Sequence, residues 1–331
     1  MAAVDFDQLF EQFKKMRVAI IGDVMLDTYM WGRVERISPE APVPVVTLEK
    51  KEFRMGGAGN VALNIASLGS NSSVLSVMGN DEDGVLLKKM FEEKNINTEF
   101  LLTSSKRITT NKIRVIGRNQ QMMRLDSEIT KDLGYEDENR LVLAVQNFIA
   151  QEKPDVVIFE DYNKGVLTEL VIRKVIELCR LNNIITAADP KRRNFFTYKG
   201  VTIFKPNLKE VKEGLNIITD GLDIPFLEGI HTSLSDQLHQ EISFITLSDQ
   251  GVFYQQGNRK RIVPSHLRNI ADVSGAGDTV IAVASLVYAV TRDVDLMAEI
   301  ANIAGGLVCE EVGTVAIRKD KLLIECKSLL K

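Results

Sequence analysis

The sequence has few cysteines, no excess of positive charge and no long hydrophobic run, and each shortage excludes a class of protein. Cys179, Cys309 and Cys326 lie far apart and form no CxxC or Cys/His cluster, which argues against a zinc site. Sparse, odd-numbered cysteines suit a reducing compartment, so we expect a cytoplasmic protein. No stretch approaches the roughly 18–20 apolar residues that cross a bilayer. The acidic, amphipathic start is unlike a signal peptide, and we expect no membrane partner.

The charge balance also argues against nucleic acid as a partner. The chain has 41 Lys and Arg against 45 Asp and Glu, a net charge of −4, whereas nucleic-acid binding needs clustered positive charge. With 45% hydrophobic and 26% charged residues the composition is that of an ordinary globular protein. The 331 residues suffice for one large α/β domain or two small ones.

Most of the chain alternates between strand-like and helix-like segments. RVAIIG at 17–22 and DVVIF at 155–159 are short apolar runs typical of buried parallel strands, and helical patterns follow such runs regularly from residue 135 onward. This alternation predicts an α/β fold, a doubly wound and mostly parallel sheet with helices on both faces. Two extended excursions, at about 28–55 and 98–126, interrupt the alternation. We expect them to form a small β-sheet lid inserted in a single domain covering 1–331.

The stretch DVSGAGDT at 272–279 precedes an apolar, helix-like run. Gly275, Ala276 and Gly277 suit a backbone that turns its N–H groups toward an anion at a helix N-terminus. The carboxylate of Asp278 would repel an anion bound beside it, so its presence there needs a separate explanation. It either caps the helix or acts as the base for a hydroxyl beside a phosphate, and we favour the base.

Polar clusters follow four of the expected strands, at 160–165, 189–191, 205–210 and 246–251. Ligands of open α/β sheets bind at the carboxyl ends of strands, so these clusters point into one crevice. Asn207 and Glu210 are three residues apart at a helix start. They suit either a hydrated Mg²⁺ or a capping box, and the spacing does not separate these two interpretations.

The glycine-rich stretch GGAGN at 56–60 is not a dinucleotide fingerprint, because it does not follow the first strand directly. We interpret Gly56, Gly57 and Asn60 as a close backbone approach to a polyhydroxy ligand. Asp23 and Asp27 follow the first strand and are either ligand contacts or turn caps. The chain contains no Walker A motif and no HRD or DFG signature, which argues against P-loop enzymes and protein kinases.

A basic set lies on the second excursion and comprises Lys112, Arg114, Arg118 and Arg124. Residues two apart on a strand share a face, so Lys112 and Arg114 can act together. Such a set suits a substrate phosphate, or it is the solvated edge strand of a sheet.

GGAGN and DVSGAGDT together resemble the two signature motifs of the ribokinase-like (PfkB) carbohydrate kinases, and the likeness runs over nearly the whole chain. The family fold, a doubly wound α/β sandwich with a small β lid, agrees with the pattern above. Within the family, GDVMLDTYMWGRVERISPEAPVPVV, RVIGRNQQMMRLD, DYNKG and KPNLKE are most similar to kinases of D-glycero-D-manno-heptose 7-phosphate. These kinases phosphorylate the anomeric 1-hydroxyl in ADP-heptose biosynthesis for the lipopolysaccharide core. Many are fused to a nucleotidyltransferase, but this chain has no HxGH-type motif, so we expect a stand-alone kinase.

The resemblance implies a role for each matching position. Asp278 would be the catalytic base, and the N–H groups of residues 275–277 would form the anion hole for the γ-phosphoryl group of ATP. Asn207 and Glu210 would organise Mg²⁺ and phosphate through water, while Ser248, Gly251 and Asn302 would border the nucleotide. The sugar phosphate would be held by Asp23, Asp27, Gly56, Gly57, Asn60 and Lys164, with Lys112, Arg114 and Arg118 from the basic set.

Two other functions remain open from the sequence. One is a kinase of the same family acting on another sugar or sugar phosphate, and a remote one is a non-catalytic sugar- or nucleotide-sensing protein. An intact Asp278 with its glycines favours catalysis over sensing. Apolar Val43, Val45 and Val46 on an exposed strand predict a homodimer formed through the lid, as is frequent in the family.

Overall fold

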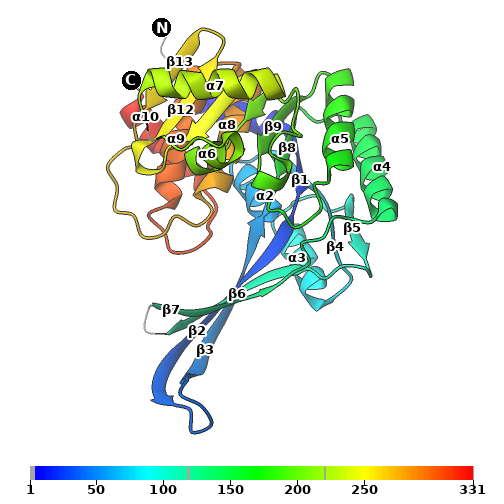
Figure 1. Cartoon of the computed structure of the whole chain (residues 1–331), viewed down its shortest axis with the longest axis vertical. Helices are drawn as coiled ribbons and strands as arrows, with labels where there is room; N and C mark the ends of the chain where they lie inside the picture. The colour runs from blue at the N-terminus through cyan, green and yellow to red at the C-terminus, as the bar shows by residue number, and fades with distance from the viewer. Residues whose placement is uncertain (1–3, 118–119, 220, 331) are drawn as a thin grey trace.

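The computed structural model describes residues 4–117, 120–219 and 221–330. Its body is a nine-stranded sheet in the order β13-β12-β11-β10-β9-β8-β1-β4-β5, parallel except where β12 and β13 join (Figure 1). The order reverses around β1, which lies between β4 and β8, so the crevice of this open sheet is expected at the carboxyl ends of β1 and β8. The strands of this sheet are β1 (Arg17–Gly22), β4 (Asn71–Gly79), β5 (Leu101–Ser104), β8 (Val156–Glu160), β9 (Ile185–Asp189), β10 (Ile203–Phe204), β11 (Ile242–Thr246), β12 (Val252–Gln256) and β13 (Arg259–Val263).

Helices cover both faces of this sheet, as the sequence alternation predicts. Successive residues of β1 point to opposite faces, so Val18 and Ile20 belong to one apolar core and Ala19 and Ile21 to the other. The first core is covered by α1 (Phe6–Gln12), α2 (Ala58–Ser67), α3 (Glu82–Glu93), α8 (Ala276–Thr291), α9 (Val294–Val308) and α10 (Lys319–Leu329). The second is covered by α4 (Tyr135–Glu152), α5 (Glu169–Leu181), α6 (Leu208–Leu215) and α7 (Ile224–Leu238). Helix α8 is buried along most of its length. Its packing therefore fixes where its N-terminus lies relative to the ends of the strands.

A second, four-stranded sheet projects from the body as an arm (Figure 1). Its order is β3-β2-β6-β7, with β2 antiparallel to β3, parallel to β6, and β6 antiparallel to β7. The strands are β2 (Val24–Ile37), β3 (Pro44–Gly57), β6 (Thr110–Gly117) and β7 (Gln120–Ser127). We call this the small sheet. It begins two residues after β1 ends, so its base lies at the carboxyl end of the central strand.

The second excursion begins later in the structure than the sequence predicts. Among the described residues of the range 98–126, those at 110–117 and 120–126 enter the small sheet, whereas Leu101–Ser104 forms β5 and extends the large sheet beside β4. Phe100 and Leu101 are buried, so this apolar run gains more from the body than from an exposed arm. Among the described residues, no helix is long and apolar enough to cross a membrane.

Candidate functional site

Asp278 lies in the first turn of α8, and a glycine turn brings it there. Gly275 caps the helix in the left-handed conformation, with φ of 79°. A Cβ at Gly275 would lie 2.7 Å from Asn60 Nδ2, so a larger residue would push α8 away from α2. The turn therefore allows the start of α8, with its unpaired N–H groups and partial positive charge, to reach the crevice.

The Asp278 carboxylate is buried and held at both oxygens. Asn60 Nδ2 donates to Oδ2 and the Tyr162 hydroxyl donates to Oδ1, each at 2.8 Å. Burial raises the pKa of Asp278 above its ordinary value, while the hydrogen bonds from Asn60 and Tyr162 act in the opposite direction. Asp278 is thus an oriented carboxylate of raised basicity, which is what a general base requires.

A charged cluster lies below the helix start. Lys205 pairs with Asp189 at 2.7 Å, and both side chains are almost fully buried. A Cβ at Gly277 would lie 3.7 Å from both charged groups, so the glycine brings the α8 backbone close to the lysine. Burial alone would raise the pKa of Asp189, but Lys191 and Lys205 lower it below its ordinary value. A phosphoryl group at this helix start would meet a lysine and backbone N–H donors together.

Asp23 and Asn60 are engaged with protein groups. Asp23 is buried and accepts from the N–H groups of Tyr162, Lys164 and Val166 at 2.8, 3.0 and 3.1 Å. It therefore ties the end of β1 to the loop after β8. The side-chain amide of Asn60 donates to Asp278. The sugar contacts assigned to both residues stay predictions, and what the structure adds is their role in holding the loop and the base.

Asp27 lies at the base of the small sheet, beside the two glycines. Arg114 Nη1 donates to its Oδ1 at 2.5 Å. A Cβ at Gly56 would lie 2.5 Å from Asp27 Oδ2, and one at Gly57 would lie 2.4 Å from the carbonyl oxygen of Asp23. Gly57 has φ of 56°, which also favours glycine. The two glycines thus allow β3 to pass close over the acids.

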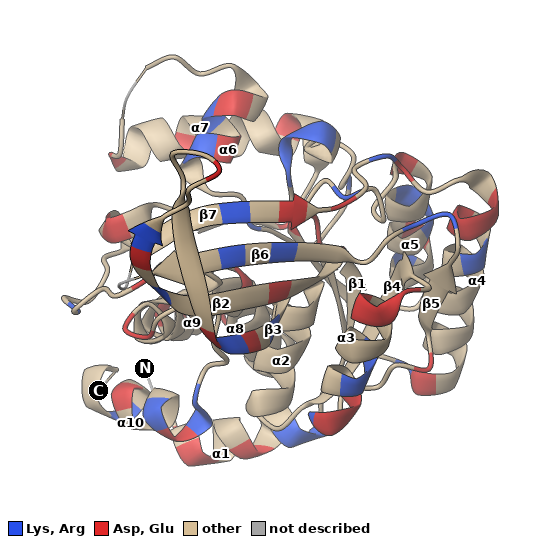
Figure 2. Cartoon of the chain, turned by 90° about the horizontal axis from the view of Figure 1, so that it is seen from below, with Lys and Arg blue, Asp and Glu red and all other residues tan. Residues whose placement is uncertain are grey.

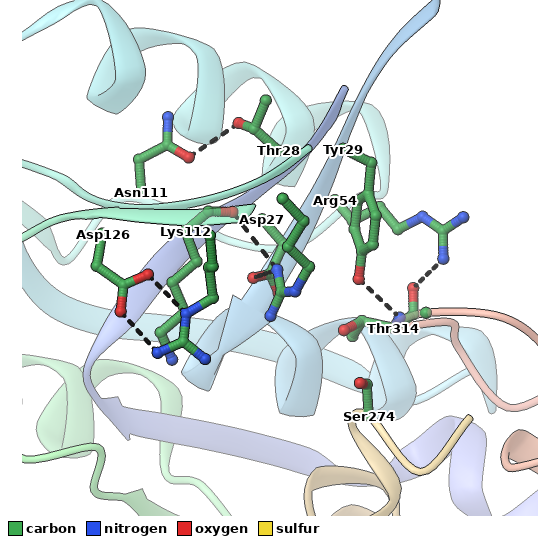
Figure 3. A network of polar contacts seen from close by, with 12 residues as sticks. Asp27, Thr28, Tyr29, Arg54, Asn111, Lys112, Asp126, Ser274 and Thr314 are labelled. Atoms are coloured by element: carbon green, nitrogen blue, oxygen red, sulfur yellow. Dashed lines mark hydrogen bonds and ion pairs between the residues drawn. The ribbon is translucent and has the colours of Figure 1, made fainter. Parts of the chain in front are cut away.

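The basic residues of β6 face the body. Strand β6 lies between β2 and β7, so the edge-strand interpretation of Lys112 and Arg114 is wrong. Lys112 is half-buried, with its ammonium group 5.0 Å from the Tyr162 ring centroid, and burial lowers its pKa. Basic segments of β6 and β7 lie side by side in Figure 2, and Figure 3 shows Lys112 near Asp27. Arg124 pairs with Asp126 on β7, and Arg118 lies outside the described residues.

Lys164 extends the same cationic surface from the loop after β8. Its ammonium group is half-buried and pairs with Glu128 at 2.7 Å. With Lys112 and Arg114 it places positive charge on the small-sheet side of the crevice, while Lys205 lies beside Gly277 of α8 and Lys191 lies near the Tyr162 ring. The crevice can therefore accept an anion on each side of Asp278.

Asn207 and Glu210 form the capping box that the spacing allowed. Glu210 N–H donates to Asn207 Oδ1 at 2.8 Å, and Asn207 N–H donates to Glu210 Oε2 at 2.9 Å. The other Glu210 oxygen accepts from Lys191 at 2.6 Å. Within the described residues, no group of three His, Cys, Asp or Glu side chains is arranged to hold a metal ion. The donors fit only an ion bound through water and phosphate, as Mg²⁺ often is.

Ser248, Gly251 and Asn302 gather around a different segment. Asn302 Nδ2 donates to the carbonyl oxygen of Pro264 at 2.8 Å. A Cβ at Gly251 would lie 2.0 Å from the carbonyl oxygen of Val263. Ser248 is exposed at the start of the turn that leads to Gly251. Residue 207 bridges to Thr246, which connects this second cluster to the capping box. Their nucleotide contacts stay predictions.

Sequence reasoning left Glu160, Tyr162, Asp189, Lys191 and Lys205 without roles. All five follow or end strands of the large sheet, and the strand-end rule marked their segments without ranking the residues. Glu160 is fully buried, and neither of its carboxylate oxygens has a hydrogen-bond partner among the described residues. Tyr162 bonds the base itself.

The comparisons with known proteins agree with this geometry. The profile of the pfkB family carbohydrate kinase matches residues 15–321. "Bifunctional protein HldE" of Syntrophotalea carbinolica is 37% identical over 326 residues, which cover 97% of this chain and 65% of that protein. Its namesake in Desulfatibacillum aliphaticivorans is 39% identical over 311 residues, covering 94% and 63%. The chain thus spans about two thirds of the length of these relatives.

Solved structures share the fold at low identity. Phosphofructokinase-2 from Escherichia coli in complex with potassium superposes with a TM-score of 0.78 at 17% identity, covering 96% of this chain and 99% of that one. Arabidopsis thaliana ribokinase complexed with ribose and ATP gives a TM-score of 0.72 at 14% identity, covering 93% and 98%. At such identities the likeness establishes the ribokinase-like fold alone.

Proposed function

We propose that this chain, which belongs to the pfkB family of carbohydrate kinases, phosphorylates D-glycero-D-manno-heptose 7-phosphate. ATP would supply the phosphoryl group, the anomeric 1-hydroxyl would accept it, and the product would be the 1,7-bisphosphate used for ADP-heptose and the lipopolysaccharide core. The observation that carries the proposal is the buried Asp278 carboxylate, held by Asn60 and Tyr162 at the N-terminus of α8.

Phosphoryl transfer depends mainly on positioning and charge stabilisation, which these residues can supply. The sugar hydroxyl would approach Asp278, which accepts its proton as the oxygen attacks the γ-phosphorus. The backbone N–H groups of residues 275–277 and the ammonium group of Lys205 would stabilise charge on the transferred group. Gly277 lies beside the Lys205–Asp189 pair, since a Cβ there would be 3.7 Å from both charged groups.

The sugar phosphate would lie between the small sheet and the loop after β8. Lys112 and Lys164 are the half-buried cations best placed for its 7-phosphate, with Arg114 held against Asp27 behind them. Asp23, Asp27, Gly56, Gly57 and Asn60 would define the space for the sugar ring. A kinase of another sugar phosphate would use the same cations, and the relatives named HldE favour the heptose.

ATP would enter from the side of Asn207, Ser248, Gly251 and Asn302. Glu210 and Asn207 would hold Mg²⁺ through water, and the ion would shield the negative charge of the triphosphate. Lys191 would move between Glu210 and the incoming phosphates, since it already bonds that glutamate. We also propose that two copies associate through the small sheet.

The test compares the wild-type enzyme with Asp278→Asn on a panel of sugars. Heptose 7-phosphate should have a higher kcat/KM than ribose, fructose or fructose phosphates. The asparagine variant should keep the thermal stability of a folded chain and lose about 10²- to 10⁴-fold in kcat, because the base is absent. Near-normal turnover by the variant would refute the base, and preference for another sugar would refute the substrate.

A further inference from the structure

The hydroxyl of Tyr162 donates to Asp278 Oδ1 at 2.8 Å. We propose that Tyr162 is a positioning residue for phosphoryl transfer, whose hydroxyl keeps the Asp278 carboxylate ionised and turned toward the sugar. The inference rests on the proposed function, because it takes Asp278 as the base. Tyr162 lies outside both signature motifs, and in its own loop the resemblance implies a role for Lys164 alone.

The tyrosine is fixed from several sides. Its backbone N–H donates to Asp23 Oδ2 at 2.8 Å, which anchors the start of the loop. The ammonium groups of Lys112 and Lys191 lie 5.0 and 5.6 Å from its ring centroid. A Cβ at Gly57 would lie 3.4 Å from its Cδ2, so the ring packs against the β3 backbone at Gly57. A ring held this firmly aims its hydroxyl in one direction.

The hydrogen bond need not block the substrate. A carboxylate oxygen can accept more than one hydrogen bond, so the sugar hydroxyl can reach Asp278 while Tyr162 still donates. Burial raises the pKa of Tyr162 well above its usual range, and the nearby Asp278 raises it further, so the phenol stays a neutral donor. Tyr162 therefore behaves as a fixed dipole aimed at the base.

Other charges also face Asp278. Asp189 at the end of β9 disfavours its ionised form, whereas Lys205 favours it. Burial acts in the same direction as Asp189. Glu160 at the end of β8 also lies in this cluster, fully buried and without a hydrogen-bond partner among the described residues, so it carries a proton and adds no negative charge. The donors on Asn60 and Tyr162 counter this combined effect, and removing either should make the base hold a proton at higher pH.

Tyr162→Phe removes the donor and keeps the ring with both cation contacts. We expect kcat/KM to fall by up to about 10-fold on the acidic side of the pH profile, the size of a lost hydrogen bond to a charged group. The acidic limb of kcat/KM should move up by roughly one pH unit, and alkaline pH should restore most of the rate. A purely structural role would lower the rate equally at every pH, and that result would overturn the proposal.

Tyr198→Phe is the matched control. Tyr198 is also buried, and its hydroxyl donates to a different carboxylate, Asp161 Oδ2, at 2.9 Å. This variant should lose a comparable amount of stability and leave the acidic limb of kcat/KM where it is in the wild type. A similar shift in both variants would mean that the limb reports general loosening of the loop, and would overturn the specific role of Tyr162.

A titration without substrate separates this proposal from the assigned reaction. The ¹³C NMR signal of the Asp278 carboxyl, assigned by its loss in Asp278→Asn, is followed with pH in the full chain. Its pKa should be higher in Tyr162→Phe than in the wild type or Tyr198→Phe. An unchanged pKa overturns the role of Tyr162. If the pKa rises but the wild type phosphorylates no sugar, the hydroxyl's hold on Asp278 stands and the kinase assignment fails.

Discussion

At the scale of single residues, Glu160 shows how the crevice balances its charges. It lies on β8 directly beside Asp189 of β9, fully buried and without a hydrogen-bond partner among the described residues. The nearby lysines are already paired, Lys205 with Asp189 and Lys191 with Glu210. An ionised carboxylate left unpaired at such a place would be very unfavourable, so Glu160 carries its proton in the folded chain.

This protonation makes Glu160→Gln a test of stability against pH. Burial raises the pKa of Glu160 well above its ordinary value, and Asp189 and Asp278 raise it further. The unfolded chain releases this proton above about pH 4.3, so the folded state binds more protons and loses stability as pH rises toward the folded pKa. Glutamine has no proton to release, so the variant should gain on the wild type by about 1.4 kcal/mol per pH unit within that window.

Urea unfolding of both proteins between mildly acidic and mildly alkaline pH measures this difference. Glu99→Gln, at an exposed glutamate, is the matched control and should track the wild type at every pH. A difference between wild type and Glu160→Gln that stays constant with pH would mean that Glu160 is ionised in the fold, paired by a group that the cluster lacks.

Residue roles were harder to predict than residue locations. The strand-end rule marked segments at 160–165, 189–191, 205–210 and 246–251. The structure brings the first three together near α8, while Gly251 of the fourth packs against residues 263–265. The contacts between individual side chains could not be predicted, because they depend on side-chain rotamers and on how far each helix reaches past the sheet. Asp23, for example, binds three backbone N–H groups, a role that its position after a strand does not reveal.

At the scale of elements, the small sheet is joined to the loop that precedes α10. Arg54 on β3 donates to the carbonyl oxygens of Val312 and Thr314 at 2.7 and 3.2 Å, and Thr314 N–H reaches the Tyr29 hydroxyl (Figure 3). A Cβ at Gly275 would lie 3.1 Å from Thr314 Cγ2. The sheet that would bind the sugar thus contacts the loop beside Gly275, where the N-terminus of α8 would bind the phosphoryl group.

Arg54→Ala should loosen this connection. Hydrogen exchange should accelerate in residues 24–57 and 311–315, and kcat/KM should fall by roughly 10-fold, the effect of losing a charged hydrogen bond. Arg33→Ala is the control on the same sheet, because the ion pair that Arg33 makes within the described part of the chain, with Glu49, is exposed and worth about 0–1 kcal/mol. Equal exchange in the two variants would show that Arg54 does not anchor the sheet.

Element prediction worked where the pattern was periodic and failed where two partners competed. The run RVAIIG is strand β1, and the helix-like run expected after DVSGAGDT belongs to α8 (Ala276–Thr291). Residues 101–104 form a strand, as predicted, but the strand joins the large sheet and not the small one. A short apolar strand does not indicate its neighbours, and here β4 offered a buried edge that the small sheet could not.

At the scale of the whole molecule, the small sheet leaves apolar side chains in solvent. Exposed large apolar residues gather on its β2–β3 hairpin and on edge strand β7, and these are Ile37, Val43, Leu48, Met122, Met123 and Leu125. Val45 and Val46, expected to be exposed with Val43, are half-buried. An exposed sheet with free edges and apolar side chains favours association with another sheet. A second copy of this chain would supply a matching one, since a two-fold interface uses the same patch twice.

The double variant Leu48→Lys/Leu125→Lys tests this association by sedimentation velocity. The wild type should sediment with twice the 37.0 kDa mass of one chain, and the variant should sediment as a monomer because burying a lysine in an apolar contact costs several kcal/mol, by a rough estimate. Leu143→Lys/Leu181→Lys, at exposed sites on α4 and α5, should remain dimeric. A monomeric wild type would show that there is no such dimer. A dimer that persists with lysines on the small sheet would place the contact elsewhere. Because the small sheet also carries Lys112 and Arg114, loss of the dimer should raise KM for the sugar phosphate more than KM for ATP.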